Sequence, residues 1–125
     1  MKVLIVDDSF TVRVKLRIFL EDDGHEVLDA NDGFSGLQVL KENKEINAIV
    51  SDLNMEKMGG MTFIENARQL EGFKETPIYI YTTETCKTLK QQAKDLGVRE
   101  WMQKPLDFTK LLSVLNEFLK EKMVL

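Results

Sequence analysis

The sequence predicts an α/β protein whose five-stranded parallel sheet is doubly wound, with helices on both of its faces. Two kinds of apolar segment alternate along the chain: short β-rich runs, and longer stretches in which apolar residues recur with helical spacing. Turn and cap signals such as Asp23-Gly24 and Gly59-Gly60 separate these segments. Five strand–helix units in 125 residues leave about 25 residues for each, and alternating units of that length favour a parallel sheet.

Each expected strand is a short run of β-forming residues, and each is followed by a helical pattern. The strands are expected at residues 2–6, 26–29, 48–51, 78–81 and 100–103. Apolar residues three or four positions apart mark the helices, within residues 12–20, 34–40, 63–70, 89–96 and 111–119. Asp107 precedes the last helix and is expected to cap its N-terminus.

Two of the strand runs are continuously apolar, VLIV at residues 3–6 and AIV at residues 48–50. Central strands of a parallel sheet are buried on both faces, and a continuous apolar run is the pattern that this burial produces. In open sheets of this kind, ligands bind outside the carboxyl ends of the strands. We therefore expect the functional residues at that edge of the sheet.

The composition is that of a soluble globular protein and argues against some classes of function. Lys and Arg total 17 and Asp and Glu total 21, a net charge of −4, whereas a nucleic-acid-binding domain usually carries a basic patch. No apolar run is long enough for a signal peptide or a membrane span, so a cytoplasmic location without membrane contact is expected. The length predicts one domain over residues 1–125, with no room for an output domain.

Polar residues of an unusual set stand at the ends of four expected strands. They are Asp7 and Asp8 after the first, Asp52 after the third, Thr82 after the fourth and Lys104 after the fifth. If the first and third strands are neighbours, three carboxylates converge on one spot. Two unit charges roughly 4 Å apart interact by about 4 kcal/mol at an effective dielectric constant of about 20, so this spot requires a cation. Oxygen ligands with open water positions suit Mg²⁺.

A simpler interpretation applies to each aspartate taken alone. A single aspartate after a strand is usually a turn residue or a helix cap. Capping does not explain three carboxylates, a hydroxyl and an amine that all fall on one edge of one sheet. The joint arrangement therefore predicts a chemical site.

With these residues in view, the sequence resembles the receiver domains of two-component response regulators, and most closely the stand-alone chemotaxis regulators of the CheY type. The resemblance covers the entire chain. The motifs that carry it are VLIVDDSFTVR at residues 3–13, SDLNM at residues 51–55, PIYIYTTE at residues 77–84 and the dipeptide Lys104-Pro105. The resemblance implies a flavodoxin-like strand order of 2-1-3-4-5, and it implies a cis peptide bond before Pro105.

The resemblance also implies a role for each residue of the site. Asp52 would accept a phosphoryl group from the phosphohistidine of a sensor histidine kinase. Thr82 would donate a hydrogen bond to the phosphoryl oxygens, and Lys104 would pair with them. The ligands of Mg²⁺ would be Asp7, Asp8, Asp52 and the backbone carbonyl of Asn54.

The chemistry of these residues agrees with those roles. A carboxylate nucleophile can form an aspartyl phosphate, and phosphoryl transfer depends mostly on positioning and charge stabilisation, which Mg²⁺ and a lysine supply. Such a protein is not an enzyme with a separate substrate. It catalyses only its own phosphorylation and dephosphorylation.

Further positions are implied in switching and in hydrolysis. Thr82 and Trp101 occupy the positions that move on phosphorylation in receivers; the alternative for Trp101 is a fixed packing residue. Asn54 and Glu84 each lie two positions past a site residue, where receivers tune hydrolysis; the alternative is a polar residue on an exposed loop. The output surface would comprise residues 86–96, the fifth strand and the last helix.

The implied partners are the kinase and a downstream protein such as a flagellar-motor switch or a phosphatase. The sequence leaves the oligomeric state open, and a monomer is the default expectation. One loop departs from the family pattern, because Glu56 stands where the family commonly has proline. Loss of the rigid proline would make this loop more mobile.

Three alternative functions remain open from the sequence. The chain could serve as a phosphorelay or phosphate-sink receiver. It could be a phosphatase resembling the haloacid dehalogenases, but that family needs an acid two residues after its nucleophile, where Asn54 stands. It could also be a pseudo-receiver that binds partners without phosphorylation.

The single histidine, the single cysteine and the two tyrosines are expected to have no role in the chemistry of the site. His25 is the only histidine and is expected at the surface, while Tyr79 and Tyr81 fit strand packing. Cys86, the only cysteine, cannot form an intramolecular disulfide and indicates a reducing compartment. We expect it as a small buried or half-buried thiol near the start of a helix.

Overall fold

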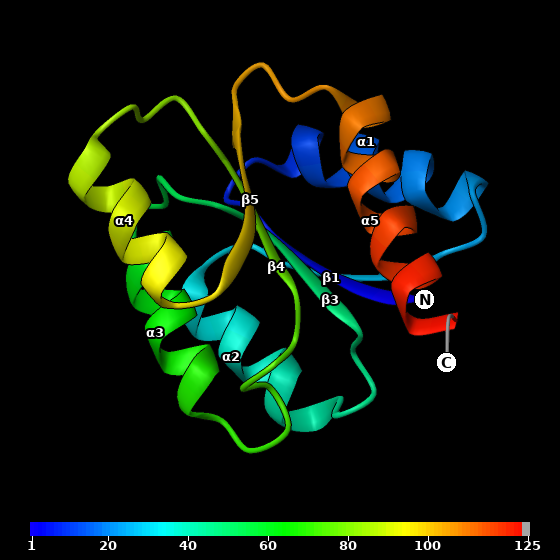
Figure 1. Ribbon diagram of the computed structural model, residues 1–125, viewed down its shortest axis with the longest axis horizontal. Coiled ribbons are helices and arrows are strands. Elements are labelled where there is room, and N and C mark those ends of the chain that lie inside the picture. Colours follow the sequence, from blue (N-terminus) through cyan, green and yellow to red (C-terminus); the bar gives the residue numbers. More distant parts are fainter. Residues whose placement is uncertain (124–125) are drawn as a thin grey trace.

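The computed structural model describes residues 1–123, and within them five strands and five helices alternate along the chain (Figure 1). The strands are β1 (Lys2–Val6), β2 (Glu26–Ala30), β3 (Ala48–Asp52), β4 (Ile78–Thr82) and β5 (Val98–Gln103). The helices are α1 (Phe10–Asp22), α2 (Gly33–Glu42), α3 (Gly60–Gln69), α4 (Lys87–Asp95) and α5 (Phe108–Met123). Every predicted strand and helix is present.

The strands form one sheet in the order β2-β1-β3-β4-β5, and every neighbouring pair is parallel. This is the flavodoxin-like order that the resemblance implies. Helices α1 and α5 cover one face of the sheet, and α2, α3 and α4 cover the other (Figure 1). None of the helices in the described residues has the length and apolar character needed to span a bilayer.

The central strands are buried on both faces, as their continuous apolar runs predict. Val3 and Ile5 pack toward α1 and α5, whereas Leu4 and Val6 pack toward the other layer, and all four are inaccessible to solvent. Successive side chains of a strand point to opposite faces, so an alternating run would have left one face exposed. Two apolar cores thus hold the sheet rigid between them.

Four strands run further than the apolar pattern predicts, and β2 does so by one residue, because it ends at Ala30. Strand β3 extends to Asp52, which pairs with Tyr81, and β4 extends to Thr82, which pairs with Gln103. Strand β5 also begins earlier, at Val98. Backbone pairing does not stop where side chains become polar, so the functional side chains sit on the last paired residues of β3 and β4.

Local caps position the helices that flank this edge. Ser9 Oγ accepts a hydrogen bond from the backbone N–H of Val12, which starts α1. Asp107 Oδ1 accepts from the backbone N–H groups of Thr109 and Lys110, so its predicted capping role is confirmed. Helix α3 begins at Gly60, where an added Cβ would lie 2.6 Å from the carbonyl oxygen of Asp52. Only glycine lets the helix start this close to the end of β3.

The predicted solvent exposure of His25 and the predicted burial of Cys86 are both wrong. His25 is only 6% exposed, because the chain reverses at Gly24 (φ +91°) and places the imidazole against the amino group of Met1, with Nδ1 at 3.2 Å from it. Cys86 does precede a helix, but it is exposed rather than buried. It lies on the loop before α4, and Leu89 and Ala93 are the residues of that helix that pack against the core.

Candidate functional site

The acidic residues converge at the carboxyl edge of the sheet. Asp7 and Asp8 follow β1, and Asp52 ends β3, its neighbour in the sheet. One carboxylate oxygen from each of the three residues lies within 4.8 Å of the other two. The condition set by the sequence, that the first and third strands are adjacent, is therefore met.

Burial makes this cluster electrostatically costly. Asp7 is 1% exposed and Asp52 is 2% exposed, whereas Asp8 faces solvent. Burial raises the pKa of Asp52, and the charge of Asp7 acts in the same direction; the backbone N–H of Asn54 and the Lys104 ammonium oppose that shift. Among the described residues, the one ion pair that these three carboxylates make is that of Asp52 with Lys104, so the site carries surplus negative charge suited to a divalent cation.

Lys104 is the cation that the chain itself supplies. Its Nζ lies 3.1 Å from Oδ2 of Asp52, and its peptide bond to Pro105 is cis, as the resemblance implies. Its backbone N–H donates to the carbonyl of Thr82 at 2.9 Å, which ties the end of β5 to the end of β4. The ammonium also lies over the ring of Tyr81, 5.5 Å from the ring centroid.

Thr82 is fully buried and is bonded to both predicted tuning residues. Its Oγ1 accepts a hydrogen bond from Nδ2 of Asn54 at 3.3 Å and from the backbone N–H of Glu84 at 3.1 Å. Asn54 is exposed on the loop after β3, and Glu84 is partly exposed on the loop after β4. The two loops therefore meet at the Thr82 hydroxyl, beside Asp52.

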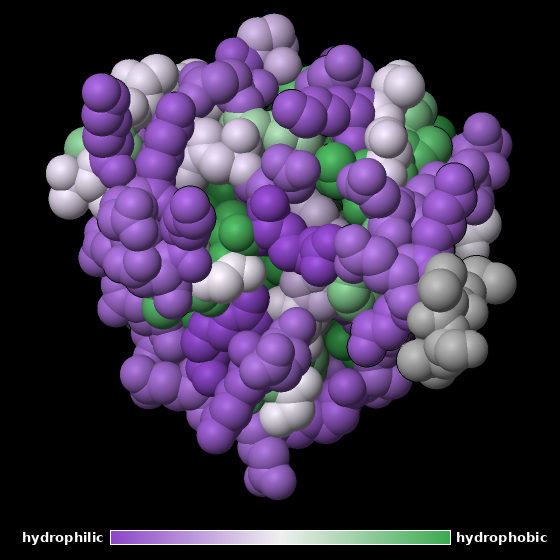
Figure 2. Space-filling view, in the orientation of Figure 1, coloured by the Kyte–Doolittle hydropathy of each residue, from purple (hydrophilic) through white to green (hydrophobic). Residues whose placement is uncertain are grey.

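Trp101 lies on β5, outside the carboxylate cluster. Its indole is half-buried against the core on the α4 side, and its Nε1 has no hydrogen-bond partner among the described residues. Trp101 lines a groove of about 280 Å³ between α4 and β5, together with Lys90, Lys94 and Arg99. The face formed by α4, β5 and α5 is mostly hydrophilic (Figure 2).

Glu56 is exposed on the loop between β3 and α3. It lines two shallow hollows that Asp8 also lines, so the residue that replaces the usual proline adds a carboxylate near the cluster. The expected extra mobility of this loop stays a prediction.

Two residues of the site were missed by the sequence analysis. The hydroxyl of Tyr81 donates a hydrogen bond to Oδ2 of Asp7. Burial, and then the charge of Asp7, raise the pKa of Tyr81 well above its ordinary value, so this hydroxyl keeps its proton. Arg13 donates to the backbone carbonyl of Asp7 at 2.7 Å and pairs with Asp29 at 3.2 Å. Strand periodicity assigned the ring of Tyr81 to the core, but no sequence signal identified Asp7 as the hydrogen-bond partner of its hydroxyl group.

The chain matches a known protein family over most of its length. Residues 3–116 match the model of the response regulator receiver domain. The chain belongs to the response regulator receiver family. Receiver domains bind Mg²⁺ at an acidic pocket, and this receiver has an aspartate cluster at the carboxyl edge of its sheet.

Several named relatives of this receiver are chemotaxis proteins. Chemotaxis protein CheY1 of Helicobacter pylori is 36% identical over 124 residues, which cover 98% of this chain and 94% of that protein. The sensor histidine kinase CheAY of the same organism is 34% identical over 119 residues, or 94% of this chain, but the chain spans only 15% of its length. The structure of chemotaxis protein CheY4 of Vibrio cholerae has a TM-score of 0.86 at 38% identity, covering 93% of this chain and 96% of that one. The receiver is therefore of the CheY type.

Proposed function

We propose that this chain is a phosphorylation-activated signalling switch. Asp52 accepts a phosphoryl group from a histidine kinase in a Mg²⁺-dependent reaction, and the phosphorylated receiver changes its affinity for a downstream protein. The observation that carries the proposal is the convergence of three carboxylates within 4.8 Å of one another beside the ammonium of Lys104, 3.1 Å from Asp52. That arrangement combines a nucleophile, a cation site and a fixed positive charge.

The transfer forms one bond and breaks one. A carboxylate oxygen of Asp52 attacks the phosphorus of the phosphohistidine, the O–P bond forms, and the N–P bond breaks. The leaving imidazole takes up a proton and returns to its neutral form. Water later attacks the aspartyl phosphate, which restores the carboxylate and releases inorganic phosphate, so the chain acts only on itself.

The residues around Asp52 fit the demands of that reaction. Lys104 places a positive charge where phosphoryl oxygens would lie, and the Thr82 hydroxyl can turn from its acceptor role to donate to one of them. Asn54 and Glu84 flank the same space through their bonds to Thr82, a position from which they would govern access of water to the phosphoryl group.

The aspartate cluster fits Mg²⁺ by the chemistry of its donors. Asp7, Asp8 and Asp52 offer hard oxygen ligands, and the backbone carbonyl of Asn54 is proposed as a fourth. A bound Mg²⁺ would neutralise charge on the nucleophile and on the phosphoryl oxygens. The exposure of Asp8 leaves the site open to water and to the phosphodonor.

The output of the switch is proposed to lie on the face formed by α4, β5 and α5. A shift of Thr82 toward the phosphoryl group would change the loop that follows β4, and Trp101 on the adjacent β5 would repack toward the space this vacates. The groove beside Trp101 is rimmed by Lys90, Lys94 and Arg99, which suits an acidic partner segment.

We propose that the receiver domain comprises residues 1–125, acts as a monomer in the cytoplasm, and serves chemotaxis through a flagellar-motor switch or a phosphatase.

The direct test is the intact mass of the protein after incubation with Mg²⁺ and acetyl phosphate, with Asp52→Asn measured beside it. We expect a gain of one HPO₃ unit in the wild type that is labile at alkaline pH and absent from the variant. An equal gain in Asp52→Asn would end the assignment of Asp52. A beryllofluoride complex that forms without any mass gain would point to fast hydrolysis or to an obligatory kinase donor.

A further inference from the structure

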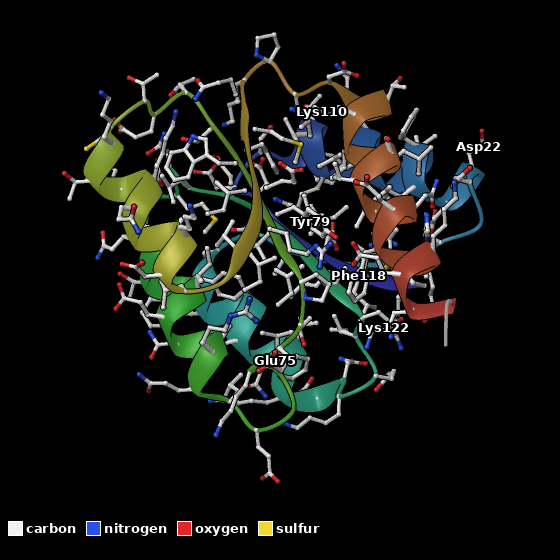
Figure 3. All side chains as sticks on the ribbon, viewed as in Figure 1. Asp22, Glu75, Tyr79, Lys110, Phe118 and Lys122 are labelled. Atoms are coloured by element: carbon white, nitrogen blue, oxygen red, sulfur yellow. The ribbon has the colours of Figure 1, made fainter. Side chains whose placement is uncertain are left out.

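The two tyrosines of the chain form a natural comparison within one strand. Tyr79 and Tyr81 lie two residues apart on β4, both are at most 1% exposed, and both pack in the core on the α1 and α5 side. The side chain of Tyr79 lies between β4 and α5 (Figure 3), and its hydroxyl has no hydrogen-bond partner among the described residues. The hydroxyl of Tyr81 donates to Oδ2 of Asp7 instead. Packing explains both rings, but it does not explain this bond.

We propose that Tyr81 is a positioning residue of the phosphoacceptor site: its hydroxyl fixes the carboxylate of Asp7, and its ring holds the ammonium of Lys104. The inference deepens the proposed function and rests on it. It assigns a role in cation binding to a strand residue whose only evident task from the sequence is packing.

The hydroxyl completes the restraint on Asp7. Oδ1 of Asp7 accepts a hydrogen bond from the backbone N–H of Ser9 at 2.7 Å, and Oδ2 accepts from Tyr81. Arg13 holds the backbone carbonyl of the same residue. Each carboxylate oxygen keeps a second lone pair, so the restraints orient Asp7 without consuming its capacity to bind a cation. Asp8 faces solvent, so Asp7 is the preorganised member of the pair.

The ring acts on the other side of the site. Lys104 Nζ lies 5.5 Å from the centroid of Tyr81 and 3.1 Å from Oδ2 of Asp52. An ammonium over an aromatic face is attracted by the ring quadrupole, which restricts where this flexible side chain can place its charge. Tyr81 also pairs in register with Asp52. One side chain therefore contacts a proposed Mg²⁺ ligand with its hydroxyl and the site's ammonium with its ring.

The test compares Tyr81→Phe with Tyr79→Phe as a matched control. Each change removes one buried hydroxyl from the same strand, and each keeps the aromatic ring. We expect Tyr81→Phe to weaken Mg²⁺ binding, measured by calorimetry, by about tenfold, the usual effect of losing a group that orients a metal ligand. Tyr79→Phe should bind Mg²⁺ as the wild type does. An unchanged Mg²⁺ affinity in Tyr81→Phe would overturn the proposal, even if that variant unfolds at a lower urea concentration.

Two kinetic quantities, the Mg²⁺ concentration for half-maximal phosphorylation and the maximal rate, distinguish a positioning role of Tyr81 from a general loss of structure. With acetyl phosphate as donor, Tyr81→Phe should need a higher Mg²⁺ concentration for half-maximal phosphorylation, and saturating Mg²⁺ should restore most of the maximal rate. A lower maximal rate with an unchanged Mg²⁺ requirement would contradict the role assigned to the hydroxyl.

A spectroscopic measurement needs no variant at the site. Protein labelled with 3-fluorotyrosine has two ¹⁹F resonances, because the chain contains two tyrosines, and Tyr79→Phe assigns them. Addition of Mg²⁺ should shift the Tyr81 resonance and leave that of Tyr79 in place. Saturation with Mg²⁺ that leaves both resonances unmoved would overturn the proposal.

Failure of the proposed function gives a different result. If the wild type binds Mg²⁺ but Asp52 is never phosphorylated, the phosphoacceptor function is refuted, and the affinity comparison still decides whether Tyr81 positions Asp7. If the wild type binds no Mg²⁺, both proposals are overturned.

Discussion

Both edges of the sheet contain charged groups that are at least partly buried, and they differ in how those charges are satisfied. At the amino edge, the partly buried guanidinium of Arg68 donates hydrogen bonds to four backbone carbonyls of the loops that precede β4 and β5. These acceptors are Phe73, Thr76, Leu96 and Gly97. At the carboxyl edge, three carboxylates face one ammonium. The charge of Arg68 is satisfied by hydrogen bonds within the chain, whereas that of the carboxylate cluster is not.

This difference separates scaffold from function. A charge that is hydrogen-bonded to several backbone carbonyls joins loops through strong bonds that need no bound ligand. A cluster with surplus negative charge is at its most favourable only when a cation enters, so its energy depends on what is bound. Changes at the amino edge should therefore affect folding, and changes at the carboxyl edge should affect ligand binding.

The largest expected effect on folding comes from Arg68→Ala. The variant leaves four carbonyls without their donor, so we expect the free energy of unfolding to fall by about 3 kcal/mol. Urea denaturation measures this loss. Arg68→Lys should recover only part of it, because an ammonium cannot reproduce the planar fork of a guanidinium. Mg²⁺ affinity should stay at the wild-type value in both variants that fold, and a strong loss of affinity would break the separation of the two edges.

The counterpart at the carboxyl edge is Asp8→Ala. It removes an exposed carboxylate ligand, so Mg²⁺ affinity should fall by about a hundredfold, or ~2.7 kcal/mol, while stability without Mg²⁺ changes little. Calorimetric titration measures the affinity, and urea denaturation in a chelator measures the stability. Unchanged Mg²⁺ binding would remove Asp8 from the ligand set.

A smaller effect is expected at a residue that lies near the site but has a local role. Asp107→Ala removes the acceptor for the backbone N–H groups of Thr109 and Lys110 at the start of α5, which should cost about 1 kcal/mol of stability. Asp107→Asn should retain most of that contribution. Because Asp107 lies outside the carboxylate cluster, the Mg²⁺ affinity of both variants should match the wild type. A large affinity loss would show that charge beyond the three aspartates contributes to binding.

The smallest effect concerns the pH dependence of stability at the amino edge. Burial, and then the charged amino group of Met1, lower the pKa of His25 below its ordinary 6.5, while Asp23 and Asn116 act in the opposite direction. The unfolded chain therefore binds a proton more readily than the folded one, and the free energy of unfolding should decrease as the pH falls below about 6.5. His25→Gln should lose this contribution and give a flatter curve in urea titrations between pH 7 and pH 5. Identical slopes for the two proteins would refute the assignment.

The sequence predicted the site at the level of residue types and strand ends. Asp7, Asp8 and Asp52 lie where their positions after the apolar runs place them, and Asp107 caps α5, because such features depend on neighbouring residues along the chain. The ends of β2, β3 and β4 were placed one residue short, and at β3 and β4 the reason is that hydrophobic periodicity ends before the backbone pairing does. The roles of Asp7, Asp8 and Asp52 in phosphorylation and metal binding remain predictions, as do those of Thr82, Lys104 and Trp101 in signalling.

By itself, the sequence determined the alternation of strands and helices, the burial of the central strands and the supply of carboxylates to one edge, since hydrophobic period and residue order specify all three. Only the tertiary structure decided that the hydroxyl of Tyr81 reaches Asp7, 74 residues away in the chain, and that Arg68 joins two loops. It also decided that His25 is buried. Periodicity assigns a side chain to a face of the sheet, but the partner of its polar end depends on how separate elements pack in space.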